Sequence, residues 1–109
     1  MRFFNVAMVI IIDFASLPSR DAFLAEKLPP QLSTHGELAN ISGGEQSFLV
    51  FCDILGVAKD ISIAFIAAWL YDHVVKHNAK SISVNGDQAA NREDLERMIQ
   101  SSIEIGKND

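Results

Sequence analysis

The chain begins with MRFFNVAMVIIIDFA, residues 1–15, and the structure of this stretch decides how the rest can fold. A basic residue, an apolar run and a small residue also occur together in secretory signals. Asn5 and Asp13 interrupt the run, however, and it is too short to span a membrane. A run rich in Val and Ile that ends at Leu-Pro-Ser is typical of a strand buried on both faces. We therefore predict a central strand here, and a cytoplasmic protein.

The composition is that of one globular domain. The chain has 109 residues, and we predict a single α+β domain over residues 1–109. Hydrophobic residues make up 49% and charged residues 21%, which argues against a disordered chain. Cys52 is the only cysteine, which excludes an internal disulfide. Its place in the apolar run FLVFCDIL favours a small buried side chain over a nucleophile.

The net charge of −5 comes from nine basic and fourteen acidic residues. The Lys and Arg residues are scattered, whereas contact with a nucleic-acid backbone needs clustered positive charge. We therefore predict no direct binding to nucleic acid. An acidic surface keeps small proteins soluble, and it also suits a basic groove on a partner.

The first half of the chain leaves one element open. Residues 19–28 predict a helix with Ser19 as its N-cap, stopped by the proline pair that follows, and residues 31–36, QLSTHG, predict a polar loop. The segment EQSFLVFCDIL, residues 45–55, fits a strand after a Gly-Gly hairpin and fits a helix equally well. The strand gives the order βαββαβ, and the helix gives a smaller sheet with an extra helix.

The second half has clearer signals. Residues 61–77 predict a helix stopped at Asn78, and its first eleven residues are apolar on nearly every side, which indicates a helix that is central or covered by a partner. A strand then leads to the hairpin pair Asn85-Gly86, and Asn91 caps a last helix. We predict a single small sheet of three to four main strands packed against helices. The leading topology is a ferredoxin-like βαββαβ order with a C-terminal helix.

The nearest approach to a catalytic or metal-binding motif is WLYDHVVKHN, residues 69–78. His73 and His77 are four positions apart and can converge on one helix face, with Asp72 or Glu104 as a third metal ligand. A zinc site needs three or four ligands, and the sequence has no HExxH and no CxxC. Positively charged side chains also favour the last turn of a helix. We predict a helix end here, with no metal and no cofactor.

Two further candidates for chemistry are weak. Asp13 ends an apolar strand, where catalytic groups often lie in α/β sheets, but no base, nucleophile or metal partner is evident. Ser42-Gly43-Gly44 lacks the lysine of a phosphate loop, and Glu45 follows it at once. We predict no catalytic residue. A small enzyme or ligand-binding domain that uses Asp13, or the pair His73 and His77, stays as an alternative.

A binding surface is the leading functional hypothesis. Phe65, Trp69 and Tyr71 lie on the all-apolar helix, and aromatic residues are enriched where proteins bind one another. We predict that these three residues bind another protein, or a second copy of the chain in a homodimer, because small monomers rarely expose so much apolar surface. No membrane is predicted as a partner.

A family resemblance rests on residues 55 to 99. Gly56 opens this region, Ala67-Ala68-Trp69-Leu70 lies in its helix, Ser81 to Val84 and Asn85-Gly86 form a strand and turn, and Leu95 to Ile99 lies in the last helix. This pattern resembles the small effector-associated α/β modules of bacterial conflict systems. The resemblance implies a non-catalytic adaptor that couples an effector to its regulator. The alternative is a mobile-element or phage inhibitor of a nucleic-acid-handling machine, since its small size, acidity and lack of catalytic motifs also fit.

Overall fold

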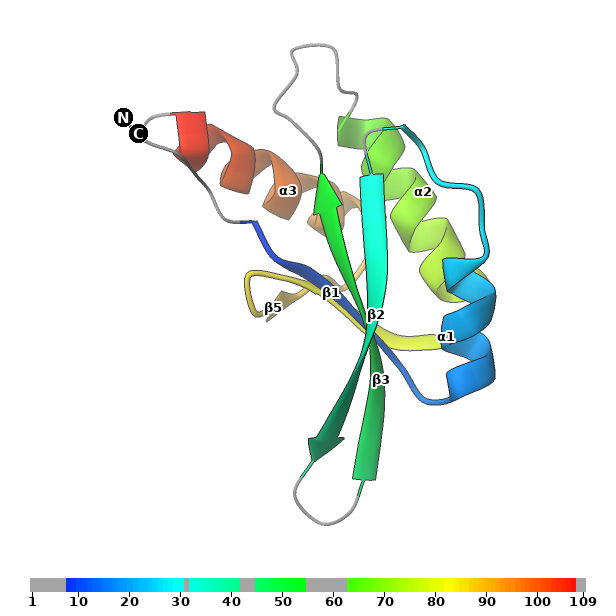
Figure 1. Ribbon diagram of the computed structural model, residues 1–109. Coiled ribbons are helices and arrows are strands. Elements are labelled where there is room, and N and C mark those ends of the chain that lie inside the picture. The colour runs from blue at the N-terminus through cyan, green and yellow to red at the C-terminus, as the bar shows by residue number, and fades with distance from the viewer. Residues whose placement is uncertain (1–7, 31, 42–44, 55–62, 108–109) are drawn as a thin grey trace.

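The computed structural model describes residues 8–30, 32–41, 45–54 and 63–107. Its elements in chain order are β1 (Ile10–Phe14), α1 (Leu17–Leu24), β2 (Leu32–Ile41), β3 (Glu45–Ile54), α2 (Ile63–Lys76), β4 (Ala79–Val84), β5 (Asp87–Gln88) and α3 (Arg92–Lys107). The strands form one antiparallel sheet in the order β2-β3-β1-β4-β5 (Figure 1). The predicted α+β class with a single sheet is confirmed. The predicted number of strands is wrong, because the sheet has five.

The strand β1 lies at the centre of the sheet, between β3 and β4. Ile10, Ile12 and Phe14 are fully buried, whereas Ile11 and Asp13 point to the opposite side and are half-buried. The apolar run does form the predicted central strand, but only one of its two faces is covered by described helices. Residues 1–7 lie outside the described part of the chain.

The first half of the strand β2 forms where a polar loop was predicted, over residues 31–36. It begins at Leu32 and pairs along its whole length with β3, which also resolves the open choice for residues 45–54 in favour of a strand. The polar residues at the start of β2 give no strand signal in the sequence, because β3 has most of the apolar residues of the pair. Gly36 suits this strand because α1 passes close above it: an added Cβ would lie 3.1 Å from Leu24 Cδ1 and 3.1 Å from Arg20 Cζ.

The helix α1 starts earlier than predicted. Ser16, not Ser19, is its N-cap, and the Ser16 hydroxyl oxygen accepts a hydrogen bond from the Ser19 backbone N–H at 3.2 Å. Pro18 lies in the first turn, where the missing N–H costs nothing. Both serines are good capping residues, so only the position of the proline separates them.

The ends of the later elements follow the predicted signals. Asn78, two positions after the last residue of α2, has a φ of 57° and ends the helix in a left-handed conformation. Asn85 and Gly86 have φ values of 53° and 91° and form the tight turn between β4 and β5. Asn91 Oδ1 accepts a hydrogen bond from the Asp94 backbone N–H at 2.8 Å and caps α3.

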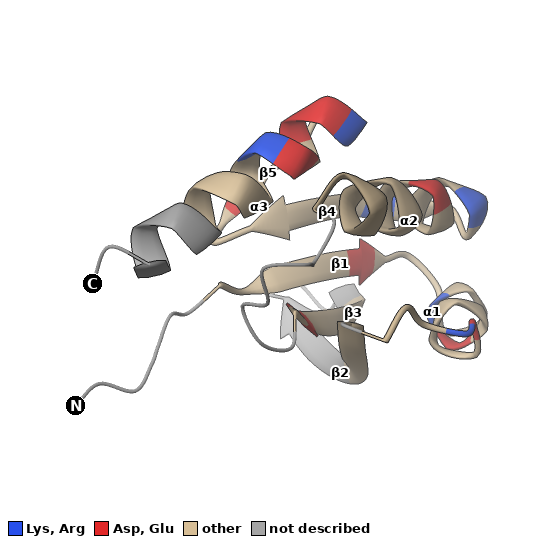
Figure 2. Cartoon of the chain, turned by 90° about the horizontal axis from the view of Figure 1, so that it is seen from above, with Lys and Arg blue, Asp and Glu red and all other residues tan. Residues whose placement is uncertain are grey.

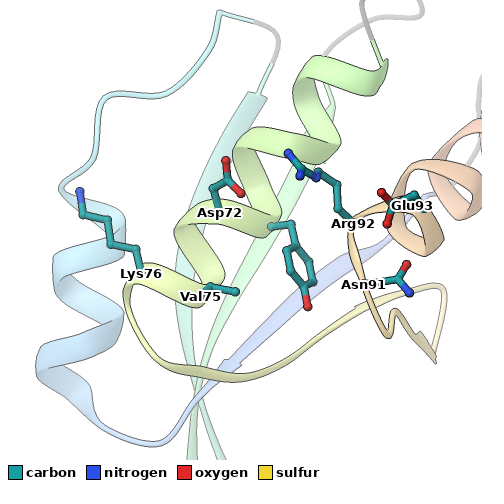
Figure 3. A pocket seen from close by; sticks show the side chains of 7 residues that line it. Asp72, Val75, Lys76, Asn91, Arg92 and Glu93 are labelled. Atoms are coloured by element: carbon teal, nitrogen blue, oxygen red, sulfur yellow. The ribbon is translucent and has the colours of Figure 1, made fainter.

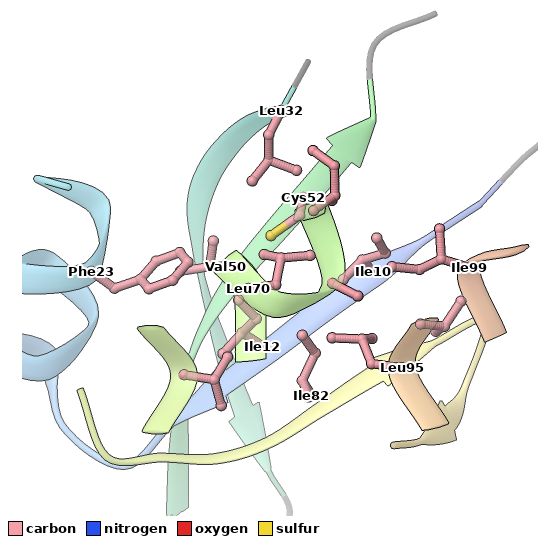
Figure 4. Close-up of a cluster of buried hydrophobic side chains, with 14 of the residues drawn as sticks. Ile10, Ile12, Phe23, Leu32, Val50, Cys52, Leu70, Ile82, Leu95 and Ile99 are labelled. Carbon is pink, nitrogen blue, oxygen red and sulfur yellow. The ribbon is translucent and has the colours of Figure 1, made fainter. Parts of the chain in front are cut away.

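One hydrophobic core joins the sheet to all three helices (Figure 4). Phe23 comes from α1, Leu70 from α2, and Leu95 and Ile99 from α3, and each is fully buried with the apolar side chains of β1, β3 and β4. Seen from above, α2 and α3 lie on one side of β4 and β1 (Figure 2). The described helices therefore cover a single side of the sheet. Within the part of the chain that is described, no helix is both long and apolar enough to cross a membrane.

The helix α2 is not covered on every side by the described residues, so it is not the central helix that was one of two predicted possibilities; its cover by a partner stays a prediction. Its buried side chains are Ile66, Ala67, Leu70 and Val74. Phe65 and Val75 are 55% and 60% exposed. The apolar residues of α2 exceed what one core can bury, because the sheet and α3 reach only part of the helix circumference.

Candidate functional site

His73 and His77 both lie close to the carboxylate of Glu26, a residue that was not among the candidates from the sequence. Glu26 follows α1, and its Oε2 lies 2.7 Å from His77 Nε2, while its Oε1 lies 3.6 Å from His73 Nε2. Lys76 Nζ donates a hydrogen bond to Oε2 at 2.9 Å. These four residues, the Glu26 cluster, tie the end of α1 to the last turn of α2.

The hydrogen bonds of the Glu26 cluster define where protons lie. A carboxylate can only accept, so His77 carries a proton on Nε2. His73 Nδ1 lies 2.8 Å from the Trp69 carbonyl oxygen and carries a proton for the same reason. Hydrogen bonds from Lys76 and His77 favour the charged form of Glu26 and lower its pKa from 4.5 to about 2.

The geometry of the Glu26 cluster is that of a bridge between helices. The two histidine rings reach different oxygens of one carboxylate, and their centroids are 6.5 Å apart. Among the residues the structure describes, no three His, Cys, Asp or Glu side chains are placed to hold a metal ion. Asp72, suggested as a third ligand, instead lines a groove with α3. The side chain of Glu104 lies outside the described residues.

The three predicted partner-binding residues do not gather in one patch. The Trp69 ring stacks on His73 at 4.0 Å between centroids and meets the edge of Phe23 at 5.9 Å, so it faces α1. Tyr71 donates a long hydrogen bond of 3.4 Å to the carbonyl oxygen of Ala90, just before α3. Phe65 is exposed. The structure therefore splits the predicted site, and the role of each residue in partner binding stays a prediction.

A shallow groove separates α2 from the start of α3 (Figure 3). Asp72, Val75 and Lys76 line one side of it, and Asn91, Arg92 and Glu93 line the other. Both signs of charge are represented equally, so the groove selects neither anions nor cations.

The side of the sheet opposite the helices has an apolar centre. Strand alternation places these residues, among others, on this open face: Ile11, Asp13, Ser33, His35, Ser47, Leu49, Phe51, Asp53, Ser81 and Ser83. The register sets Phe51 beside Ile11 and Leu49 beside Asp13, and His35 stacks on Phe51 at 5.5 Å between ring centroids. Antiparallel sheets that face water usually present polar residues, so an apolar centre needs an explanation.

The open face also holds two side-chain atoms that lack hydrogen-bond partners. Asp13 Oδ1 and Ser47 Oγ are buried, and neither has a partner within the described part of the chain. Buried polar atoms are nearly always hydrogen-bonded, so such exceptions point to a role. Asp13 lies on the opposite side of the sheet from the Glu26 cluster, whose His77 ring packs against the buried Phe23. The two candidates for chemistry therefore cannot form one site.

Two candidates from the sequence remain, the cysteine and the Ser-Gly-Gly loop. Cys52 points to the helix side and is 1% exposed, which confirms its predicted burial. That burial, with the nearby charge of Asp53, raises its pKa to about 12 and makes the thiol a poor nucleophile. Ser42-Gly43-Gly44 lies outside the described residues.

The sequence could locate only part of the Glu26 cluster and of the open face. The histidine spacing is local and visible, whereas Glu26 lies 51 positions from His77. The open face needed the register of three strands, which no short pattern contains. Searches for similar proteins found no match for this chain among family models, curated proteins or solved structures.

Proposed function

We propose that the chain is a non-enzymatic protein–protein interaction domain that binds its partner with the open face. One observation carries the proposal: Ile11, Leu49 and Phe51 form an apolar centre on a side of the sheet that no described helix covers. An apolar centre with a polar rim is the usual anatomy of a protein interface. Ser33, Ser81 and Ser83 supply such a rim on the two neighbouring strands.

The fold supports this use of the sheet. We infer that β1 to β4, with α1 and α2, form a ferredoxin-like βαββαβ unit to which β5 and α3 are added. The strand order β2-β3-β1-β4 supports this classification. In such a unit the two helices pack on one side, and the other side is available for a partner. An adaptor role, as the sequence resemblance implies, needs only such a surface and no catalytic group.

The helix α2 offers a second surface for the same function. Phe65 and Val75 are the large apolar residues it exposes most, at 55% and 60%. Trp69 and Tyr71 contribute less there, because each packs against a neighbouring element of the same chain. The helix lies on the opposite side of the sheet from the open face, so substitutions can test the two surfaces separately.

The test compares two matched substitutions, Phe51→Ser on the open face and Phe65→Ser on α2. Each tagged variant and the wild type is used for a pull-down from a lysate of the host organism, and light scattering gives the mass of the eluted assembly. We expect wild type and Phe65→Ser to retain a stoichiometric second protein, and Phe51→Ser to lose it. Circular dichroism checks that both variants are folded.

The opposite pattern would move the interface to α2, as the sequence first suggested. In that outcome Phe65→Ser loses the second protein and Phe51→Ser keeps it. If wild type elutes alone as a monomer, the interaction function itself is contradicted.

A further inference from the structure

We propose that the partner brings a lysine or arginine side chain to Asp13, within an otherwise apolar segment. This inference rests on the proposed function, since it needs the open face to be the binding surface. It adds the chemistry of the partner. Apolar side chains of the partner would cover Ile11, Leu49 and Phe51, and its positive charge would pair with the carboxylate of Asp13 beside them.

Asp13 carries a negative charge at the edge of the apolar centre. It is the only charged residue of β1 and lies one position before the end of that strand. Its cross-strand neighbours are Leu49 on β3 and Ser81 on β4. The Asp13 side chain is half-buried, and one of its oxygens is shielded from water with no hydrogen-bond donor among the described residues. A charge in such surroundings gains strongly from a donor that carries the opposite charge.

Residues within the described part of the chain do not supply that charge. Lys80 is the extra residue of the bulge next to Asp13, yet it is exposed, and none of the ion pairs between described residues joins the two. Among the described residues of the open face, His35 is the only one with a basic side chain, and it stacks on Phe51 one row away.

Ser47 extends the polar site beside Asp13. It lies on the open face two positions before Leu49, the cross-strand neighbour of Asp13. Its buried hydroxyl oxygen also lacks a partner in the described part of the chain. A guanidinium group offers five donors in one plane, so it can satisfy a carboxylate and a nearby hydroxyl together.

Charge favours a different protein over a second copy of this chain as the occupant. Asp13 and Asp53 both lie on the open face, so two copies packed face to face would bring four carboxylates together. Like charges across an interface disfavour binding, whereas a basic segment is complementary.

The experiment selects short random peptides displayed on phage against the immobilised full chain. We expect the selected peptides to combine apolar residues with Lys or Arg. Their dissociation constants are then measured for wild type, Asp13→Asn and the control Asp72→Asn, which removes the same charge from α2. We expect Asp13→Asn to weaken binding by about fivefold or more, and Asp72→Asn to leave it unchanged. Binding to wild type should also weaken between about 0.1 M and about 1 M salt.

A change in the peptide gives a test that needs no variant of the protein. Replacing its Lys or Arg by Gln should weaken binding as much as Asp13→Asn does. If selected peptides lose binding with Phe51→Ser but tolerate both the Gln replacement and Asp13→Asn, this inference is overturned and the proposed function stands. If no peptide depends on Phe51, both are contradicted. A wild-type dimer that Phe51→Ser dissociates would make a second copy the occupant, and would overturn the inference as well.

Discussion

At the scale of single residues, Glu26 should make the stability of the fold depend on acidic pH. Its pKa falls from 4.5 to about 2 because Lys76 and His77 donate hydrogen bonds to its charged form. A carboxyl group with a lowered folded pKa stabilises the protein above its unfolded pKa, and that contribution disappears as the pH falls through the folded value. We expect Glu26→Gln to lower the free energy of unfolding at neutral pH and to flatten its change between pH 4.5 and about 2. Urea unfolding over a series of pH values measures both effects.

The matched control is Glu93→Gln, which removes one negative charge from an exposed position at the start of α3. It should leave the acid dependence of the wild type in place. If Glu26→Gln keeps that dependence as well, the Glu26 cluster does not stabilise the fold as described.

Single residues also mark how far the sequence could locate the sites. His73 and His77 stand out because their spacing of four follows from helix geometry. Their carboxylate partner could not be found, since only the packing of α1 against α2 brings Glu26 to them. Asp13 was singled out as the end of a strand, but its orphaned oxygen depends on the neighbouring strands and leaves no trace in the sequence.

At the scale of elements, the N-cap of α3 should contribute measurably to the free energy of unfolding. Asn91 Oδ1 accepts a hydrogen bond from the Asp94 N–H, and Asp94 accepts one in turn from the Ala90 N–H at 3.0 Å. Replacing an Asn cap by Ala typically costs about 1 kcal/mol. We therefore expect Asn91→Ala to lower the free energy of unfolding by about 1 kcal/mol, as followed by circular dichroism in urea.

The control substitution for the cap is Ser101→Ala, at an exposed position inside the same helix. Ala is the better helix former, so this change should be neutral or slightly stabilising. Equal losses from the two substitutions would mean that the cap contributes nothing specific to α3.

Elements were predicted well where their signals are local and unambiguous. Asn85-Gly86 and Asn91 fulfil their predictions because positive φ and N-capping each demand particular residues. Ser19 was the wrong cap because Ser16 offers the same chemistry three positions earlier. The first half of β2 was missed because its residues, LSTHG, are polar and were predicted as a loop.

At the scale of the whole molecule, the sheet and all three helices share one hydrophobic core, and this core governs how the chain unfolds. The α+β class could be read from the alternation of strand and helix signals along the sequence. The number of strands could not, because β5 has only two residues and the first half of β2 is polar. All three helices bury fully hidden side chains in the same cluster, so none has a core of its own.

We therefore expect the chain to unfold in one cooperative transition. Trp69 is the only tryptophan and lies between α1 and α2, so its fluorescence reports that contact, while far-ultraviolet circular dichroism reports all three helices. The two signals should share one midpoint in urea, as two-state unfolding requires. Leu95→Ala empties a fully buried position on α3 and should lower the free energy of unfolding by about 2–5 kcal/mol. Because the core is shared, both signals should shift together. A circular dichroism change that precedes the fluorescence change would instead mean that α3 unfolds independently of the sheet.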